Sequence, residues 1–354
     1  MYAITTLSRI SRQNKKHIAA VAQFLQQNNL DLDPQVTEFI VLRQQDNIVA
    51  CGGLDGDIIK CVAVADSLRG QGVLLKLITE LINLAVEHGH TALFVYTRTE
   101  NERLFRDCGF TTLVSVPGRM VLMENSGSRL THYLQTLAAQ RRPGSRISAI
   151  VMNANPFTNG HLHLVRYAAA NADWLHLFMV NEDASQFPFR DRLALVRAAT
   201  KEIHNLTVHP GSRYIISRAT FPSYFIKDKA QVAGCHAQID ITLFRQYIAP
   251  VLGITRRVVG EEPRCPVTAC YNRELRYWLS TPTLPFAPIE LVEIPRLSWL
   301  KEPISASRVR ELIRQKRYAE VAPLVPDTTL AWLQSRLNLH PEQAPAILTE
   351  TGKP

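Results

Sequence analysis

Apolar and polar positions along the chain follow two spacings, one typical of strands and one typical of amphipathic helices. In the first third of the chain, the spacing predicts helices over 15–27, from about 73 to 87 and over 101–107. It predicts strands over 38–43, 47–54, 58–64, 92–96 and 110–116. Together these elements indicate a mixed α/β domain over residues 1–124.

The rest of the chain has a different pattern. A linker is expected over 125–145, where Asn125-Ser126-Gly127-Ser128 breaks the strand pattern and Arg141-Arg142-Pro143-Gly144 precedes the next strand. From 146 to 336, predicted strands (147–152, 174–180, 213–216, 255–260 and 289–294) alternate with predicted helices (161–172, 190–204, 240–249, 268–279 and 305–315). Such alternation predicts a doubly wound, Rossmann-like domain with a parallel sheet. Residues 337–354 are expected to form a frayed tail.

Composition places the chain among globular proteins. It has 354 residues, 46% hydrophobic and 20% charged, which suits two domains of ordinary size. No apolar run is long enough for a transmembrane helix, and the basic N-terminal stretch lacks a signal-peptide core. The six cysteines form no CxxC pair, which argues against a zinc site and favours a reducing, cytoplasmic location. We therefore expect no membrane contact and no metal site built from protein side chains.

The net charge of +9 restricts the kinds of partner. Basic residues are dispersed along the chain and do not interleave with aromatic residues as on a nucleic-acid stacking platform, so nucleic acid is not expected as a partner. Nucleotide substrates or an acidic protein remain as explanations of the charge.

The most informative motif connects a predicted strand to a predicted helix. After the strand at 147–152 comes Asn155-Pro156-Phe157-Thr158-Asn159-Gly160-His161, at the start of the next helix. A helix N-terminus presents free N–H groups that suit a phosphate, Gly160 permits close approach and His161 adds a donor. The run 158–161 resembles the (T/H)xGH signature of HIGH-type nucleotidyltransferases. A histidine that only caps the helix is the alternative.

A second phosphate element is expected about 145 residues further on. Ile304-Ser305-Ala306-Ser307-Arg308-Val309-Arg310 resembles the ISSSxVR element of the same superfamily. The resemblance implies that ATP lies between the two motifs. His161 and Thr158 would stabilise its α- and β-phosphates, while Ser305, Ser307 and Arg310 would hold the departing pyrophosphate, with Mg²⁺ bridging phosphates. It also makes Asn155, Phe157 and the strand-end Gly260 candidate nucleotide neighbours. An ordinary helix cap with solvated arginines is the alternative.

The first domain carries its own anion motif. Arg69-Gly70-Gln71-Gly72 resembles the start of the pyrophosphate loop of GCN5-related N-acetyltransferases, and Asn101, Leu104-Phe105 and Gly109-Phe110 resemble a later element of that family. This resemblance implies that the loop binds a coenzyme-A-like group. Two positions depart from the pattern: Leu74 replaces a small residue, and Phe105 stands where many members carry a proton-donating tyrosine. A domain that binds such a group without N-acetylation is therefore expected. A strand–turn–helix without ligand is the alternative.

The order of the two modules, together with runs such as Val259-Gly260-Glu261-Glu262-Pro263, resembles the citrate lyase ligases. The resemblance implies an acid–thiol ligase that forms acetyl-adenylate from acetate and ATP. The acetyl group would then pass to the phosphoribosyl-dephospho-coenzyme-A arm of the acyl carrier (gamma) subunit of citrate lyase. Two alternatives stay open: an adenylyltransferase acting on phosphopantetheine or nicotinamide mononucleotide, and a non-catalytic acetyl-coenzyme-A sensor.

Overall fold

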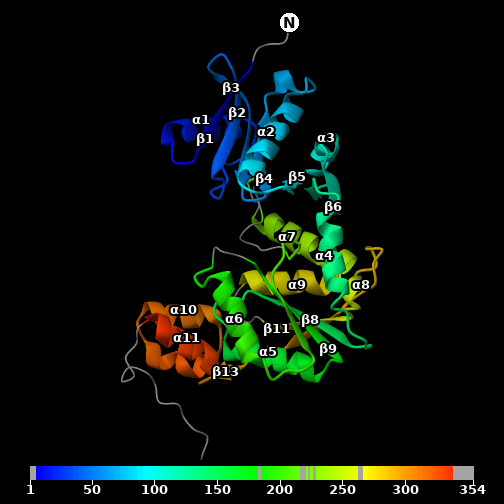
Figure 1. Ribbon diagram of the computed structural model, residues 1–354, viewed down its shortest axis with the longest axis vertical. Helices are drawn as coiled ribbons and strands as arrows, with labels where there is room; N and C mark the ends of the chain where they lie inside the picture. The colour runs from blue at the N-terminus through cyan, green and yellow to red at the C-terminus, as the bar shows by residue number, and fades with distance from the viewer. Residues whose placement is uncertain are drawn as a thin grey trace, which may run out of the picture. The chain divides into compact units, whose positions relative to one another are not determined.

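The computed structural model describes residues 5–181, 185–215, 221, 224–225, 229–261 and 266–337. The chain forms two compact units (Figure 1). Unit 1 comprises Met1–Thr136 and Phe221–Leu243, and unit 2 comprises Leu137–Thr220 and Phe244–Pro354. Residues 221–243 therefore belong with the N-terminal unit, although their range lies within the second domain predicted from the sequence.

Unit 1 is built on a seven-stranded sheet with the order β1-β2-β3-β4-β5-β7-β6. Its strands are β1 (Thr6–Ser11), β2 (Glu38–Gln44), β3 (Asn47–Asp55), β4 (Ile58–Val64), β5 (Phe94–Thr97), β6 (Thr111–Val116) and β7 (Met120–Glu124). All neighbours are antiparallel except β4 and β5. The sequence pattern misses β1, an edge strand in which only Ile10 is buried, and β7, in which every residue is buried. Neither strand shows the alternation that marks a half-buried strand.

Helices cover this sheet. They are α1 (Lys15–Gln27), α2 (Val73–Glu87), α3 (Glu102–Asp107), α4 (Arg129–Ala138), which runs into unit 2, and α7 (Lys229–Leu243). Helix α2 buries Leu77, Leu81 and Leu84 in the main apolar core. A Cβ at Gly52 of β3 would lie 2.6 Å from Leu81 Cδ1, so glycine at this position lets the helix approach the sheet closely.

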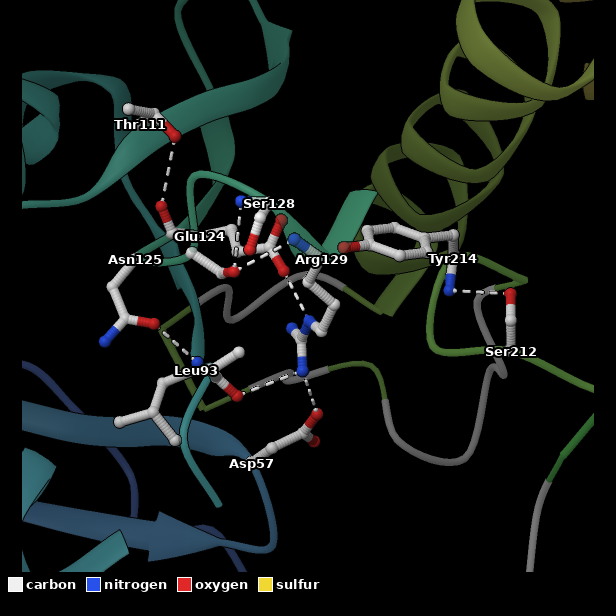
Figure 2. A network of polar contacts seen from close by, with 11 residues as sticks. Asp57, Leu93, Thr111, Glu124, Asn125, Ser128, Arg129, Ser212 and Tyr214 are labelled. Atoms are coloured by element: carbon white, nitrogen blue, oxygen red, sulfur yellow. Dashed lines mark hydrogen bonds and ion pairs between the residues drawn. The ribbon is translucent and has the colours of Figure 1, made fainter. Parts of the chain in front are cut away.

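Arg129, at the start of α4, holds several segments of unit 1 together (Figure 2). Its Nε donates to Glu124 at 2.5 Å, and its Nη1 donates to Asp57 at 2.9 Å. The guanidinium also lies 4.1 Å from the ring centroid of Phe94. The Glu124 side chain is fully buried, and the ion pair with Arg129 compensates its charge.

Unit 2 contains a five-stranded parallel sheet with the order β10-β9-β8-β11-β12. Its strands are β8 (Ile147–Met152), β9 (Trp174–Met179), β10 (Leu206–His209), β11 (Arg256–Gly260) and β12 (Glu290–Ile294). The chain adds strands on one side of β8 and then returns to add β11 on the other side. The parallel, Rossmann-like sheet predicted from the sequence is confirmed. The strand predicted at 213–216 is wrong, because residues 213–215 form a turn and the edge strand lies earlier, at β10.

The helices of unit 2 are α5 (Asn159–Ala170), α6 (Phe189–Ala199), α8 (Ala249–Leu252), α9 (Pro266–Ser280), α10 (Ala306–Arg314) and α11 (Asp327–Leu337). A short hairpin of β13 (Ser298–Trp299) and β14 (Glu302–Pro303) precedes α10. The predicted helix 240–249 is instead the end of α7 followed by a π-helical turn over Phe244–Ile248. Within the described ranges, no helix has both the length and the apolar character needed to cross a membrane.

A pair of histidines is buried between β9 and β10. His176 Nδ1 lies 2.9 Å from His209 Nε2, and Phe178 stacks on the ring of His209 at 4.4 Å. Burial lowers the pKa of His176 to about 4, and the positive charge of Arg142 lowers it further. Burial also lowers the pKa of His209 to about 3, with an added contribution from the charge of His176. Both rings are therefore neutral at physiological pH.

Candidate active site

A cavity of about 660 Å³ opens in unit 2 at the carboxyl ends of β8, β11 and β12. The strand order reverses between β8 and β11, which is where open parallel sheets bind ligands. The two motifs singled out from the sequence meet here. Seven of the predicted site residues line the cavity: Asn155, Thr158, Gly160 and His161 from the first motif, Ser305 and Ser307 from the second, and the strand-end Gly260.

The start of α5 fixes the orientation of His161. Thr158 is the N-cap, and its Oγ1 accepts from the backbone N–H of His161 at 3.3 Å. In return, the Nδ1 of His161 accepts from the backbone N–H of Thr158 at 3.0 Å, which completes a capping box. The ring stacks on Phe157 with centroids 5.6 Å apart. Since Nδ1 acts as an acceptor, the ring proton is assigned to Nε2.

The protonation of His161 suits a donor role. Burial lowers its pKa to about 4, and the positive charge of Arg296 adds to the shift. The ring is therefore neutral at pH 7 and offers one N–H, from Nε2. His161 does cap the helix, as the alternative interpretation held, but the same ring also lines the cavity.

The start of α10 forms the opposite wall. Ser305 caps this helix, and its Oγ accepts from the backbone N–H of Arg308 at 3.2 Å. Arg310 does not line the cavity directly: its Nη2 donates to Ser307 Oγ at 3.1 Å and its Nη1 to the carbonyl oxygen of Asn155 at 2.5 Å. Arg310 thus links the two helix starts. Burial lowers its pKa, yet a guanidinium remains charged at any physiological pH.

Gly160 explains how closely the two motifs approach. A Cβ at this position would lie 3.1 Å from the carbonyl oxygen of Ile304, the residue that precedes the α10 cap. The glycine therefore makes room for the second motif as well as for a ligand. Gly260 lies across the cavity, where a Cβ would meet only Arg296 Cγ at 3.8 Å, so its backbone is open to the cavity.

Asn155 and Phe157, the two predicted neighbours of the nucleotide in the first motif, differ in whether they line the cavity. Asn155 lines the cavity, and its Oδ1 accepts from the backbone N–H of Phe187 at 3.1 Å. Phe157 is fully buried in the core of unit 2 and supports the His161 ring from behind. Phe157 is thus placed to position the histidine, and the lining does not include it.

The structure adds residues that the sequence motifs did not single out as ligands. Arg308 lines the cavity, and its buried Nη1 has no hydrogen-bond partner among the described residues. Arg296, after β12, and the exposed His163, two residues beyond His161 on α5, also line the cavity. In the sequence, two positions could have indicated these arginines as ligands: Arg308 follows the cap of a predicted helix, and Arg296 follows the end of a predicted strand.

Arg192, in the first turn of α6, supports the site without lining the cavity. Its side chain is buried and donates to the carbonyl oxygens of Phe187, Asn153 and Val180. These contacts fix the loop after β8. The described lining of the cavity contains no aspartate or glutamate, and no cluster of three metal-ligating side chains occurs in the described part of the chain.

Unit 1 has a separate cavity of about 670 Å³, lined by Arg69, Gly70 and Gly72 but not by Gln71. Gly70 and Gly72 have φ values of 76° and 77°, which only glycine adopts readily, and Gly72 directly precedes α2. The loop therefore presents a helix N-terminus to the cavity. Arg69 is exposed and pairs with Asp66 at 2.7 Å.

The other wall of this cavity is closed by aromatic residues. Phe105 lines it and packs edge-on against Phe110, so no phenol is present at that position. Tyr224 and Phe225 also line it: the Tyr224 carbonyl accepts from Asp31 N–H at 2.9 Å, and the Phe225 carbonyl accepts from Arg98 Nη2 at 3.1 Å. This closure comes from the 221–243 segment, and no sequence motif had indicated it.

Comparison with known proteins agrees with both modules. Residues 147–333 match the model of the citrate lyase ligase C-terminal domain, and residues 2–110 match that of the acetyltransferase (GNAT) family. Citrate (pro-3S)-lyase ligase of Escherichia coli (strain K12) is 55% identical over 351 residues, 99% of both chains. The ligase of Klebsiella pneumoniae is 48% identical over 321 residues, covering 91% of this chain and 94% of the relative. Among solved structures, Thermotoga maritima TmcAL bound with alpha-thio ATP aligns with a TM-score of 0.37 at 15% identity, covering 56% of this chain and 57% of that one.

Proposed function

Because this chain belongs to the citrate lyase ligase family, we propose that it activates citrate lyase by acetylating the prosthetic group of its acyl carrier subunit. The reaction consumes ATP and acetate and releases AMP and pyrophosphate. The observation that carries the proposal is the shared cavity of unit 2, in which the starts of α5 and α10 face one ligand site.

The first half-reaction forms acetyl-adenylate. An acetate oxygen attacks the α-phosphorus of ATP, the new O–P bond forms, and the bond to pyrophosphate breaks. The cavity needs no nucleophile of its own, because alignment and charge stabilisation supply the rate. His161 Nε2–H and Thr158 would stabilise the α- and β-phosphate oxygens. Ser305, Ser307 and the free N–H groups of α10 would hold the pyrophosphate, together with the unpaired Nη1 of Arg308.

Arg310 contributes mainly by position. Its fork joins the Asn155 carbonyl to Ser307, so it holds the two halves of the site at a fixed separation. Mg²⁺ would enter with ATP as its phosphate complex, since the described lining offers no carboxylate ligand. Bound Mg²⁺ would neutralise charge on the leaving pyrophosphate.

In the second half-reaction, the thiol of the phosphoribosyl-dephospho-coenzyme-A arm attacks the acetyl carbonyl. A thioester forms, the carbonyl–oxygen bond to AMP breaks, and the thiol proton leaves to solvent. The cavity of unit 1 fits a docking role for this arm, with Arg69, Gly70 and Gly72 at its anion end; Gln71 belongs to the same loop. Phe105 in place of a proton-donating tyrosine argues against N-acetylation there.

Pyrophosphate exchange into ATP tests the function. We expect exchange that depends on acetate and Mg²⁺, and full reaction with deacetylated citrate lyase should yield AMP and recovered lyase activity. Exchange that requires phosphopantetheine or nicotinamide mononucleotide instead of acetate would identify an adenylyltransferase. Absence of AMP formation with acetate and lyase would favour a sensor.

The docking role of unit 1 has its own test. Charge reversal at Arg69 (Arg69→Glu) should weaken binding of the arm-bearing carrier subunit at least several-fold, because the loop loses a cation at the anion end of the cavity. Arg119→Glu is the matched control, since Arg119 is exposed in the β6–β7 turn and outside the cavity. Equal affinity of wild type and Arg69→Glu would remove the docking role.

A further inference from the structure

The β13–β14 hairpin of unit 2, whose first strand is labelled in Figure 1, exposes large apolar side chains beside the adenylation cavity. Leu297 and Pro303, at the base of the hairpin, both line the cavity. Further out, Trp299 is 42% exposed and Leu300 is 78% exposed. Leu300 is the most exposed of the large hydrophobic residues in the described chain. Large apolar side chains clustered beside a site often mark a binding surface.

The backbone of the tip indicates that these side chains are not there for folding. Ser298 pairs with Pro303 and Trp299 with Glu302, so Leu300 and Lys301 form a two-residue loop. Both have positive φ values, 51° and 65°. Such a loop strongly prefers Asn-Gly, because leucine and lysine are strained in this conformation. Leu300 and Lys301 therefore make the hairpin less stable than an Asn-Gly loop would. Strained residues of this kind are common where side chains serve a function.

We propose that this tip, formed by Trp299, Leu300 and Lys301, is the surface on which the acyl carrier subunit docks to deliver its thiol to unit 2. This inference rests on the proposed function and adds the location of a protein–protein contact. The thiol must reach an acyl-adenylate inside the cavity, so its carrier has to approach the mouth that the hairpin borders.

Charge favours the same occupant. Lys301 lies at the tip, and Arg296 and Arg308 line the adjoining cavity. The chain as a whole carries a net charge of +9. A lysine beside two exposed apolar side chains, on a chain of net charge +9, suits a partner with an acidic surface and an apolar patch. The large aromatic ring of Trp299 would act as the anchor of the contact.

A pair of variants separates docking from folding. Trp299→Ala removes the anchor. Leu300→Asn with Lys301→Gly gives the loop its preferred sequence, so this double variant should unfold at the same temperature as wild type or a few degrees higher. Tyr167→Ala is the control, because Tyr167 is exposed on α5 and outside the cavity lining.

The readouts are the affinity for purified arm-bearing carrier subunit, measured by titration calorimetry, and acetate-dependent ATP–pyrophosphate exchange measured without carrier. Both hairpin variants should bind the carrier at least tenfold more weakly, with exchange within twofold of wild type. Unchanged carrier affinity in both variants would overturn the inference, as would a hairpin effect confined to the KM for ATP, which would make the tip a nucleotide lid. If the wild-type protein shows no acetate-dependent exchange, the proposed function is contradicted. The affinity for the carrier subunit tests the docking surface independently of that result.

Discussion

His161 is the residue at which structure and chemistry can be separated most cleanly by substitution. The two ring nitrogens have different roles. Nδ1 accepts a hydrogen bond from the Thr158 N–H at 3.0 Å, and Nε2–H is available to donate to a phosphate. An alanine removes both. Asparagine places Oδ1 near the position of Nδ1, so His161→Asn keeps the capping contact and removes only the outer donor.

The expected magnitudes differ for the two roles. Loss of one preorganised donor to developing charge lowers a rate by roughly 100- to 1,000-fold, or about 2.7–4 kcal/mol of transition-state stabilisation. Loss of one capping hydrogen bond destabilises the fold by only about 0.5–1.5 kcal/mol, which shifts the unfolding temperature by a few degrees. His161→Asn should therefore unfold near the wild-type temperature yet exchange pyrophosphate about 100-fold more slowly. His161→Ala should show both defects.

Acetate-dependent ATP–pyrophosphate exchange at pH 7.5, with thermal unfolding measured on the same samples, provides the assay. His204→Ala is the control, because His204 is exposed in unit 2 and outside the cavity. Full exchange activity in His161→Asn would refute the donor role. A rate loss in His161→Ala that follows only its loss of stability would reduce the residue to a helix cap.

Three further predictions concern the packing around the site and the stability of each unit. Gly160→Ala places a methyl group 3.1 Å from a carbonyl of the second motif, so the KM for ATP should rise several-fold in exchange kinetics; an unchanged KM would show that the two motifs can separate freely. The lowered pKa values of His176 and His209 mean that their neutral rings contribute stability that is complete above the unfolded value of about 6.5 and is lost as pH falls toward 4 and then 3. Between pH 6.5 and pH 5, the free energy of unfolding should fall by about 3 kcal/mol. Urea unfolding should show this fall in wild type but not in the His176→Leu/His209→Leu double variant. An equal dependence of the unfolding free energy on pH in the two proteins would contradict the lowered pKa values. Arg129→Ala removes the ion pairs to the buried Glu124 and Asp57, so unit 1 should lose about 3–5 kcal/mol in urea unfolding, whereas a loss below about 1 kcal/mol would contradict a stabilising role for these ion pairs.

The sequence predicts most elements whose burial is one-sided. Helix α1 lies at the predicted residues, because its single apolar face leaves a clear helical period. Elements without that period were missed or misplaced. Strand β7 is buried throughout, and β10 is a four-residue edge strand whose buried terminal residue is a histidine. Local pattern cannot distinguish such a strand from a loop.

The candidate site shows the same limit. Spacing and motif indicated that two helix starts carry the chemistry, and the structure brings Thr158, His161, Ser305 and Ser307 to one cavity. Side-chain packing decides which arginine faces that cavity. Arg308 lines it, whereas the guanidinium of Arg310 donates hydrogen bonds to the Asn155 carbonyl and to Ser307 Oγ. The Tyr224–Phe225 wall in unit 1 is a contact between residues far apart in the sequence, so no local signal marks it.

A crystal structure of the chain with a non-hydrolysable acetyl-adenylate analogue tests the central claim most directly. We expect the phosphate within hydrogen-bond distance of His161 Nε2, the adenosine beside Gly260, and the acetyl group on the side of the phosphate opposite the N-terminus of α10, which holds the pyrophosphate that leaves in line. An analogue bound only in the cavity of unit 1, with no ligand between α5 and α10, would contradict the account.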